Sequence, residues 1–343
     1  MYTDNIKINS QISLWLGSMF WLISLMIVVG GLTRLTDSGL SITEWQLFSG
    51  VLPPLSQSDW VNYFNLYKEI PEFKLQNYDM SLSEFKIIFW WEWIHRFLGR
   101  LIGLAFVIPL IYFTFFVKFK KLINFYFIFI LICFQGFIGW YMVSSGLVDR
   151  VDVSHYRLSV HLMGAFIILS LILWQYLMVK NISVSEKKIN IFIPCIFLFL
   201  IFCQISIGAF VSGMDAGTIY NSWPLMGTSY FPDDNEIINL FNLKAFNDPS
   251  LVQFMHRNLA YIIMFFYLFI YFLIFKKKLI NLYLIINTVG FLLIVQITLG
   301  VLTLLYGAQI KFASMHQISS IFLVSSCIYL IYKNRNVNLQ LSN

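Results

Sequence analysis

Long apolar segments recur along the chain and are separated by polar connections. Each segment is long enough to cross the roughly 30 Å hydrocarbon core of a bilayer as a helix. The sequence therefore predicts an all-α integral membrane protein with eight transmembrane helices, at residues 14–33, 88–117, 122–143, 158–179, 190–212, 252–275, 279–304 and 312–332. Ser81 and Glu84 form a candidate capping box, so we expect the second helix to begin before it enters the membrane.

Two of the connections, 34–87 and 213–251, are much longer than the others. In the first, Trp60, Phe64 and Tyr67 recur at helical spacing, which predicts a short helix that lies on the membrane surface and is ended by Pro71. We interpret this helix as a lid or an anchor and assign no chemistry to it.

Composition supports the membrane class, since 59% of the residues are hydrophobic and only 12% are charged. Basic side chains gather in alternate connections and in the C-terminal tail: Lys118, Lys120, Lys121, Lys180, Lys187, Lys188, Lys276, Lys277, Lys278, Lys333 and Arg335. By the positive-inside rule that side is cytoplasmic, which puts both termini inside and both long connections outside. The net charge of +6 is largely this lysine, so we expect no nucleic-acid surface. Residues 1–10 lack the features of a cleavable leader, so we expect the first helix to be retained.

The cysteines lie inside apolar segments, at Cys133, Cys195, Cys203 and Cys327. The sequence contains no CxxC pair, and neither long connection contains a cysteine. We therefore interpret the cysteines as small buried hydrophobic residues rather than as disulfide partners or zinc ligands.

The two halves of the chain repeat one arrangement of residues. A glycine, an Asp-x-Gly and a tryptophan keep the same spacing in two places, at Gly30, Asp37, Gly39 and Trp45 and again at Gly208, Asp215, Gly217 and Trp223. In the helices that follow, His95-Arg96 is matched by His256-Arg257, His161 by His316, and the segment 135–139 by 296–300. Four helices in each half predict two pseudo-symmetric four-helix bundles, residues 1–180 and 181–343, related by a pseudo-two-fold axis along the membrane normal.

Four of the five histidines lie near the outer end of an even-numbered helix: His95, His161, His256 and His316. Two imidazoles from facing helices of one bundle are a common way to hold a haem iron from both sides. The alternative for each is a buried histidine that is hydrogen-bonded to another helix, but the matched depth and the repeat favour one haem in each half. We interpret His155, whose repeat position is Ile310, as an ordinary loop histidine, with a proton carrier at the outer mouth as the alternative.

The halves differ beside the histidines. Glu92 precedes His95 by three residues and shares its helix face, whereas Gln253 stands in the same place before His256. A carboxylate beside a metal ligand can transfer protons during catalysis, and an amide cannot. We therefore predict that Glu92 is catalytic and that the second half supports the first. The alternative for Glu92 is an acid stabilised near a helix start.

Four arginines are candidate partners for haem propionates: Arg34, Arg96, Arg100 and Arg257. For the last three, an anchor at the membrane surface is an equal alternative. Arg34 marks a second asymmetry, because Ser212 occupies its repeat position. The closely spaced glycines Gly99 and Gly103, and Gly136 and Gly139, are predicted to permit close approach of helices.

These motifs resemble those of the haem A synthase family across nearly the whole chain, and are most similar to its mitochondrial and alphaproteobacterial branch. The resemblance rests on residues 30–41, on Trp-Glu-Trp-Ile-His-Arg at 91–96, on Tyr156-Arg157 followed by His161, on 213–217, and on Phe-Met-His-Arg at 254–257. The first and last of these motifs are specific.

The resemblance implies oxidation of the C8 methyl of haem O to a formyl group by successive hydroxylation, which gives haem A for terminal oxidases. It implies that His95 and His161 bind the substrate haem beside Glu92, and that His256 and His316 hold a haem b. A haem O synthase and an electron donor such as a ferredoxin are the implied partners, and a homo-oligomer is a further candidate. Some bacterial relatives carry a cysteine pair in an outer loop, which this chain lacks. We expect a multi-pass protein of the bacterial inner membrane.

Two rival interpretations fit some of the same residues. A dihaem b-type cytochrome that carries electrons, for example from quinol, would also need four histidines at matched depth. A proton-coupled transporter built from two repeats would use histidines as a relay. The apolar segments, however, lack Gly/Pro breaks at matching mid-membrane positions, which disfavours the transporter.

Overall fold

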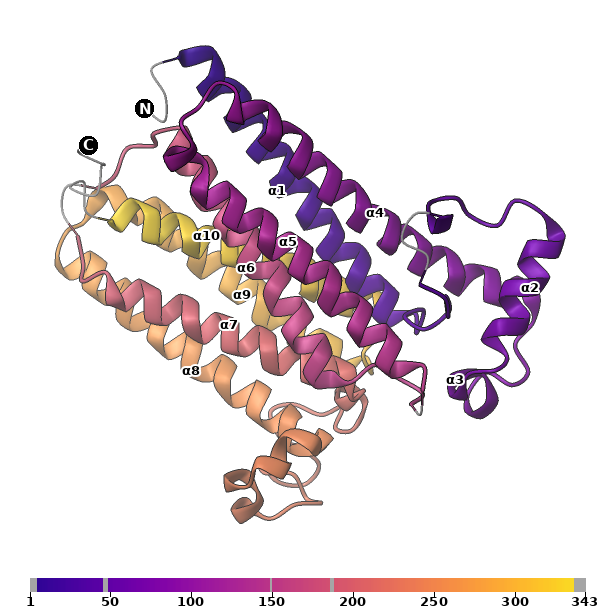
Figure 1. Cartoon of the computed structure of the whole chain (residues 1–343). Helices are drawn as coiled ribbons and strands as arrows, with labels where there is room; N and C mark the ends of the chain where they lie inside the picture. The colour runs from indigo at the N-terminus through magenta and orange to yellow at the C-terminus, as the bar shows by residue number, and fades with distance from the viewer. Residues whose placement is uncertain (1–4, 46–48, 149, 186–187, 336–343) are drawn as a thin grey trace.

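The computed structural model describes residues 5–45, 49–148, 150–185 and 188–335, and this part of the chain is helical apart from its connections (Figure 1). Eight helices are long and apolar enough to cross a membrane, which confirms the predicted class. They are α1 (Ile6–Leu35), α4 (Leu82–Thr114), α5 (Phe119–Gly146), α6 (His155–Val179), α7 (Phe192–Gly213), α8 (Pro249–Lys276), α9 (Tyr283–Leu305) and α10 (Ile310–Asn334). The short helix η5 (Ile280–Leu282) leads directly into α9.

The long helices pack as two groups of four. In the first group α1, α4, α5 and α6 form a ring of neighbours, and in the second α7, α8, α9 and α10 do the same. The groups meet along α1, α6, α7 and α10, and one continuous apolar core extends through both. The predicted boundary between residues 180 and 181 falls in the connection from α6 to α7. The pseudo-two-fold axis stays a prediction.

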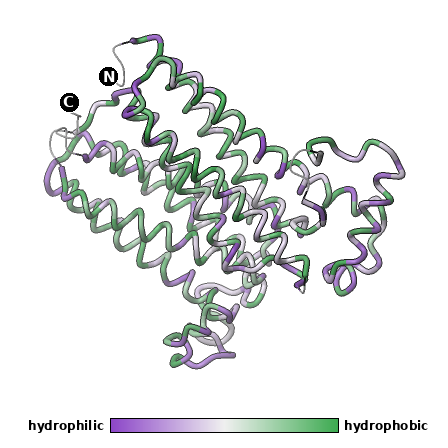
Figure 2. The backbone as a smooth tube through the Cα atoms, in the orientation of Figure 1, coloured by the Kyte–Doolittle hydropathy of each residue, from purple (hydrophilic) through white to green (hydrophobic). Residues whose placement is uncertain are grey.

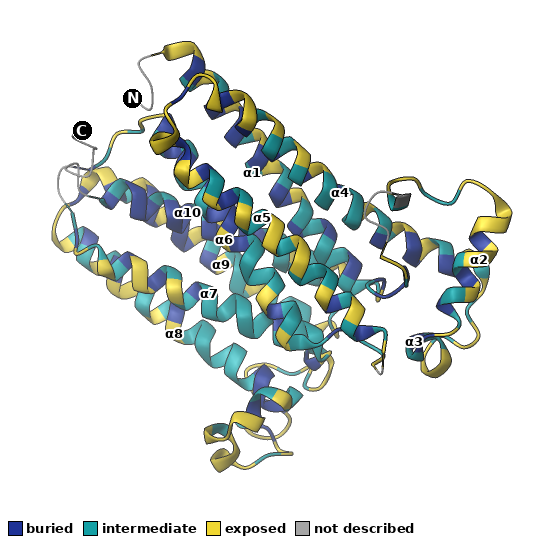
Figure 3. Cartoon of the chain, viewed as in Figure 1, coloured by how far each residue is buried: buried dark blue, intermediate teal, exposed yellow. Residues whose placement is uncertain are grey.

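Three of the four helices along which the groups meet, α1, α6 and α10, are more buried than the other long helices, whereas α7 is only 17% buried. About half of the most apolar stretch of α1 (50%) and α10 (56%) is buried, against 22% for α4, α5 and α8. Figure 3 shows α10 as largely buried, and Figure 2 shows that apolar residues nevertheless dominate the exposed lengths of the outer helices. An apolar exposed surface is what a lipid-facing helix requires.

The predicted basic connections lie at one end of the molecule. The beginning of α1 and the end of α10 lie at that end, and the two projecting outer segments lie toward the other (Figure 1). Because the long helices alternate in direction, the connections after α4, α6 and α8 return to the end where α1 begins. Lys187 lies outside the described residues. The assignment of this end to the cytoplasm stays a prediction.

The second membrane helix begins where its capping box predicts. The backbone N–H of Glu84 donates to Ser81 Oγ (3.3 Å), and the backbone N–H of Ser81 donates to Glu84 Oε2 (2.8 Å). With 33 residues at about 1.5 Å of rise each, α4 is longer than the bilayer is thick. It is therefore long enough for its first turns to project beyond the membrane.

The projecting turns of α4 carry the helix α2 (Gln57–Tyr67). The side chains of Trp60, Phe64 and Tyr67 are buried, and their rings lie 4.9–5.2 Å from those of Phe85 and Phe89 on α4. The predicted helix is confirmed, but its apolar stripe faces α4 rather than a membrane surface. The prediction was wrong on this point because the projection of α4 offers the stripe a protein surface.

Pro71 does not end this helix. Instead α2 ends at Tyr67, and Pro71 is the first residue of the next helix, α3 (Pro71–Leu75). Proline is favoured at that position because the missing N–H has no intrahelical partner there. The other outer segments contain the short helices η1 (Ser49–Val51), η2 (Ala216–Thr218), η3 (Ile237–Phe241) and η4 (Leu243–Asn247).

All four cysteines are free, as predicted. Cys327 is buried and Cys203 is half-buried, but Cys133 and Cys195 are exposed. The prediction that all four are buried was therefore wrong for these two. They lie on α5 and α7, where lipid can cover an exposed thiol.

Candidate functional site

The structure brings the predicted histidines together in two pairs. The ring centroids of His95 on α4 and His161 on α6 are 6.4 Å apart, and those of His256 on α8 and His316 on α10 are 6.5 Å apart. Within each pair the rings are steeply inclined to each other, by 72° and 78°. Each group of four helices thus contains one pair.

The spacing of each pair suits an iron held between two imidazoles. With metal–nitrogen bonds of about 2 Å, two rings on opposite sides of one ion have their centres roughly 6 Å apart. In the part of the chain that the structure describes, no group of three or more His, Cys, Asp or Glu side chains could hold a metal ion. A two-imidazole set suits a metal whose remaining ligands come from a porphyrin. The residues present therefore fit a haem in each half.

Each histidine ring packs against a glycine of a neighbouring helix. A Cβ added to the glycine would lie 3.0–3.1 Å from the nearest ring atom in the pairs Gly30 and His95, Gly139 and His161, Gly208 and His256, and Gly300 and His316. Such contacts are tighter than ordinary packing, so even alanine would press on the ring. The four glycines occupy matching positions in the two halves.

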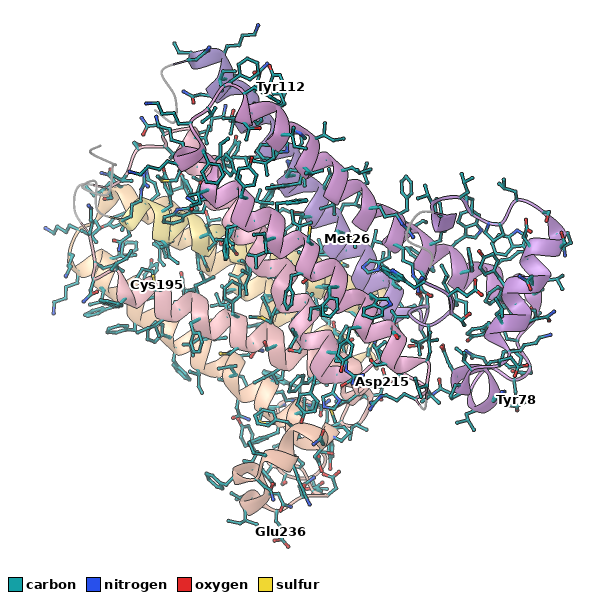
Figure 4. All side chains as sticks on the ribbon, viewed as in Figure 1. Met26, Tyr78, Tyr112, Cys195, Asp215 and Glu236 are labelled. Atoms are coloured by element: carbon teal, nitrogen blue, oxygen red, sulfur yellow. The ribbon has the colours of Figure 1, made fainter. Side chains whose placement is uncertain are left out.

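Other glycines do not have the predicted role. A Cβ added to Gly103 or Gly136 would meet no atom within 4 Å, and one added to Gly99 would meet only the terminal methyl of Met26, at 3.6 Å. The prediction that these three permit close helix approach was therefore wrong. Met26 lies on α1, and Figure 4 labels it.

Glutamines hold three of the four histidines. The side-chain amides of Gln135, Gln204 and Gln296 donate to the backbone carbonyls of His161 (2.6 Å), His256 (2.9 Å) and His316 (3.0 Å). Each amide also lies 3.1–3.3 Å from a ring nitrogen of the same histidine. Sequence reasoning assigned these glutamines no role. The missed signal was the motif Gln-x-x-x-Gly, whose glycine contacts a histidine ring in each of the three cases.

The fourth position of this motif is different. Met26 stands four residues before Gly30, where the other three helices carry glutamine. Among the described residues, no glutamine donates to His95. In the second half, His316 Nδ1 also lies 3.0 Å from the backbone carbonyl of Gln296, and His316 Nε2 lies 3.4 Å from the side-chain amide of the same glutamine.

Glu92 is buried, with 2% of its surface exposed, and both of its oxygens are occupied. Oε2 accepts from Ser41 Oγ (2.7 Å) and from the backbone N–H of Ile42 (2.7 Å). Oε1 accepts from Arg96 Nε (3.0 Å) and Nη2 (2.6 Å). The carboxylate thus accepts four hydrogen bonds, two of them from the single guanidinium of Arg96. The ion pair with Arg96 was not anticipated from the sequence.

Arg96 also binds the outer segment that follows α1. Its guanidinium donates to the backbone carbonyls of Ile42 (2.7 Å) and Glu44 (3.1 Å). Arg257 does the same in the second half, where it donates to the carbonyls of Tyr220 (2.9 Å) and Ser222 (2.9 Å). Each arginine therefore holds an outer segment over the helix that carries its histidine.

Gln253, the counterpart of Glu92, donates through its amide to the carbonyl of Tyr220 (3.1 Å). The second half thus keeps the contact with the outer segment, but its described residues place no buried carboxylate there. Arg100 lines a small cavity with Arg96 and with Ile42 and Glu44 of the outer segment. A role of the four arginines in binding propionates stays a prediction.

His155 lies at the contact between the two helix groups rather than in a loop. It is the first residue of α6, as Ile310 is of α10. Its ring lies 5.2 Å from that of Phe210 on α7, and a Cβ added to Gly213 would lie 2.9 Å from its Cα. Its Nε2 is buried without a hydrogen-bond partner. Helix packing explains its position, and a proton-carrying role stays untested.

Comparison with known proteins covers nearly the whole chain. Residues 13–328 match the model of the COX15-CtaA family, described as cytochrome oxidase assembly proteins. A haem A synthase of Pelagibacter ubique is 50% identical over 98% of this chain and 100% of its own length. A haem A synthase of Rickettsia bellii is 43% identical (95% and 99%), and one of Flavobacterium johnsoniae is 40% identical (95% and 98%).

Proposed function

The chain belongs to the COX15-CtaA family of cytochrome oxidase assembly proteins, and we infer from this membership that it is a haem A synthase of the bacterial inner membrane. Such an enzyme converts haem O to haem A by oxidation. Haem O is therefore the substrate and haem A the product. These comparisons do not favour the rival functions, which were an electron-carrying dihaem cytochrome and a proton-coupled transporter.

We propose that the two histidine pairs divide the work. His95 and His161 hold the substrate haem, and His256 and His316 hold a haem b, which when bound supplies one-electron transfer. The observation that carries this division is the difference between Glu92 and Gln253. The two halves share their histidines, the glycines that contact them and the arginine that follows the first histidine (Arg96 and Arg257), but only the first places a buried carboxylate three residues before a histidine.

Successive hydroxylation is the proposed route from methyl to formyl. Each of two steps replaces a C–H bond of the C8 methyl by a C–O bond, and the resulting geminal diol loses water to give the aldehyde. Each hydroxylation is a two-electron oxidation of the methyl carbon, and an external oxidant accepts those two electrons. The protein contributes binding, orientation and electrostatics.

Glu92 contributes a fixed negative charge. Its carboxylate is held by Ser41, Ile42 and Arg96, so it does not need to reorganise when positive charge develops at the methyl carbon. This arrangement favours charge stabilisation over proton relay, because every carboxylate oxygen already accepts two hydrogen bonds. Arg96 and Arg257 keep the outer segments in place above the two sites.

The outer end of each half is where we propose that propionates lie. Arg100, which shares a cavity with Arg96, is the proposed partner in the first half. A haem O synthase upstream, an electron donor such as a ferredoxin and a homo-oligomeric assembly are further proposals that rest on the family alone.

Mass spectrometry of extracted haem tests the proposed function. The chain is co-expressed with an enzyme that makes haem O, as wild type and as His161→Ala and His316→Ala. We expect haem A or its hydroxymethyl precursor in the wild type, neither in His161→Ala, and unconverted haem O with loss of haem B in His316→Ala. If a well-folded wild type loaded with both haems and supplied with reductant yielded only haem B and haem O, the electron-transfer alternative would replace the synthase.

A further inference from the structure

Arg34 joins the two halves at their outer ends. Its Nη2 donates to the carbonyl of Ser212 (2.8 Å) and to Asp215 Oδ1 (2.9 Å), both at the end of α7. Its Nη1 lies 2.5 Å from Asp37 Oδ1 and 3.9 Å from Asp152 Oδ1 in the first half. Figure 4 labels Asp215 at this junction. The side chain of Arg34 is only 12% exposed, so the guanidinium is largely enclosed by these partners.

The sequence repeat explains why the second half has no such arginine. Asp37 and Asp215 are repeat equivalents, and so are Arg34 and Ser212. Arg34 therefore donates to the carbonyl of the residue that occupies its own place in the other half. Two equivalent residues in direct contact lie where the halves meet, and a second guanidinium there would face the first at close range. Like charges that close are unfavourable, which disfavours arginine at position 212.

The segments that Arg34 joins lead directly to the histidine helices. Beyond Asp37, which has a left-handed φ of 47°, the chain reaches Ser41 and Ile42, which bind Glu92. Beyond Asp215, with φ of 50°, it reaches Tyr220 and Ser222.

Arg257, which follows His256 in the sequence, donates to the backbone carbonyls of Tyr220 and Ser222. The side chain of Arg34 thus fixes the start of both outer segments. The first segment is attached to α4, which carries His95, and the second is attached to α8, which carries His256.

We propose that Arg34 is a positioning residue that holds the outer segments of the two halves together and so keeps both histidine pairs aligned, without touching either haem. This role rests on the proposed haem sites for its spectroscopic consequence, but not for its structural one. It is proposed in place of a propionate contact for Arg34, because Nη1 and Nη2 already have two carboxylates and a carbonyl as partners, although Nε is buried without a hydrogen-bond partner.

Moving the arginine across the junction tests this proposal. Arg34→Ser removes the guanidinium, Ser212→Arg adds a second one, and the double variant Arg34→Ser/Ser212→Arg transfers it to the other half. Hydrogen exchange of residues 37–44 and 215–222 reports the two segments, and absorption and electron paramagnetic resonance spectra report the two haems. Arg34→Lys, which keeps the charge but not the forked geometry, is a milder variant should Arg34→Ser fail to fold.

We expect exchange in Arg34→Ser to rise roughly threefold in both segments, because the carboxylates of Asp37 and Asp215, each 66% exposed, lose the guanidinium that joins them. Both haem spectra should change, and the double variant should restore exchange and spectra together. A change confined to one segment and one haem, not restored by the double variant, would overturn the proposal in favour of a contact with that haem. Because exchange needs no turnover, restored exchange in a protein that forms no haem A would retain this inference while refuting the synthase.

Discussion

Glu92 and Arg96, one turn apart on α4, form two hydrogen bonds of 2.6 and 3.0 Å on the helix that carries His95. The pair also joins α4 to the backbone of Ile42, which donates to Glu92 and accepts from Arg96. A carboxylate in this setting can act through its charge and also through the segment that it holds. These two effects are separable by experiment.

Glu92→Gln removes the charge and keeps the shape. We expect haem O to be retained while its conversion falls by about 10²-fold or more, in the range found when a single electrostatic stabiliser is removed. Single-turnover conversion, measured by mass spectrometry of extracted haem, provides the test. Ser41→Ala is the matched control, since it removes one donor to the carboxylate and leaves the charge in place. Loss of haem O binding in Glu92→Gln would show instead that Glu92 acts by holding the outer segment.

Gly139→Ala should disturb the first histidine pair. The new methyl would lie 3.0 Å from the His161 ring, and an overpacked contact of this kind costs about 1–3 kcal/mol. We expect haem O to be lost roughly tenfold more readily, as followed by spectroscopic titration with a competing haem-binding protein. Gly136→Ala, one turn away on the same helix, meets no atom within 4 Å and should behave as wild type. Equal effects from both variants would argue against the ring contact.

Each histidine pair should account for one haem. His256→Ala is expected to remove the second-half haem and leave the first-half haem bound, because the pairs lie in different helix groups. Quantification of iron and haem per protein, together with the spectrum of the remaining haem, measures this. His155→Ala is the control, since His155 belongs to neither pair and should leave both haems in place. Simultaneous loss of both haems from a folded His256→Ala protein would contradict independent sites.

The stability of α2 and α3, the helices of the first outer segment, should depend on pH through Glu72. This side chain is 3% exposed, and burial, followed by the charges of Glu92, Asp152 and Asp37, raises its pKa from 4.5 to about 8. Its contact with Tyr67 acts in the opposite direction. The folded state therefore retains a proton that the unfolded state releases between these values. The free energy of unfolding should fall as pH rises through this range, by up to about 1.4 kcal/mol per pH unit.

Hydrogen exchange of α2 and α3, corrected for the intrinsic effect of pH, measures this dependence. Glu72→Gln should flatten the profile, because the amide does not titrate. Glu69→Gln, at a side chain that is 79% exposed, should leave it unchanged. A profile in Glu72→Gln as steep as that of the wild type would assign the dependence to another group.

The sequence predicted what depends on local pattern. Apolar length alone located the eight helices, and the repeat indicated which histidines would face each other. The partners of Glu92 could not be found in this way, because Ser41 and Ile42 are about fifty residues away and reach it only through the fold of the outer segment. The direction of the stripe on α2 was missed for a related reason. Nothing in its own residues shows that α4 continues beyond the membrane to meet it.

The methionine at position 26 has a consequence for the exchange of substrate and product. A cofactor can stay bound for the life of the protein, but a substrate must be admitted and its product released in every cycle. Three histidines each accept a hydrogen bond from a glutamine side chain; among the described residues no glutamine donates to His95, since methionine occupies position 26 in place of glutamine. An imidazole with fewer outer hydrogen bonds is held less firmly in its ligating orientation. If His95 and His161 hold the substrate, we expect His95 to dissociate from the iron first. Release of haem A and binding of the next haem O would then begin at His95.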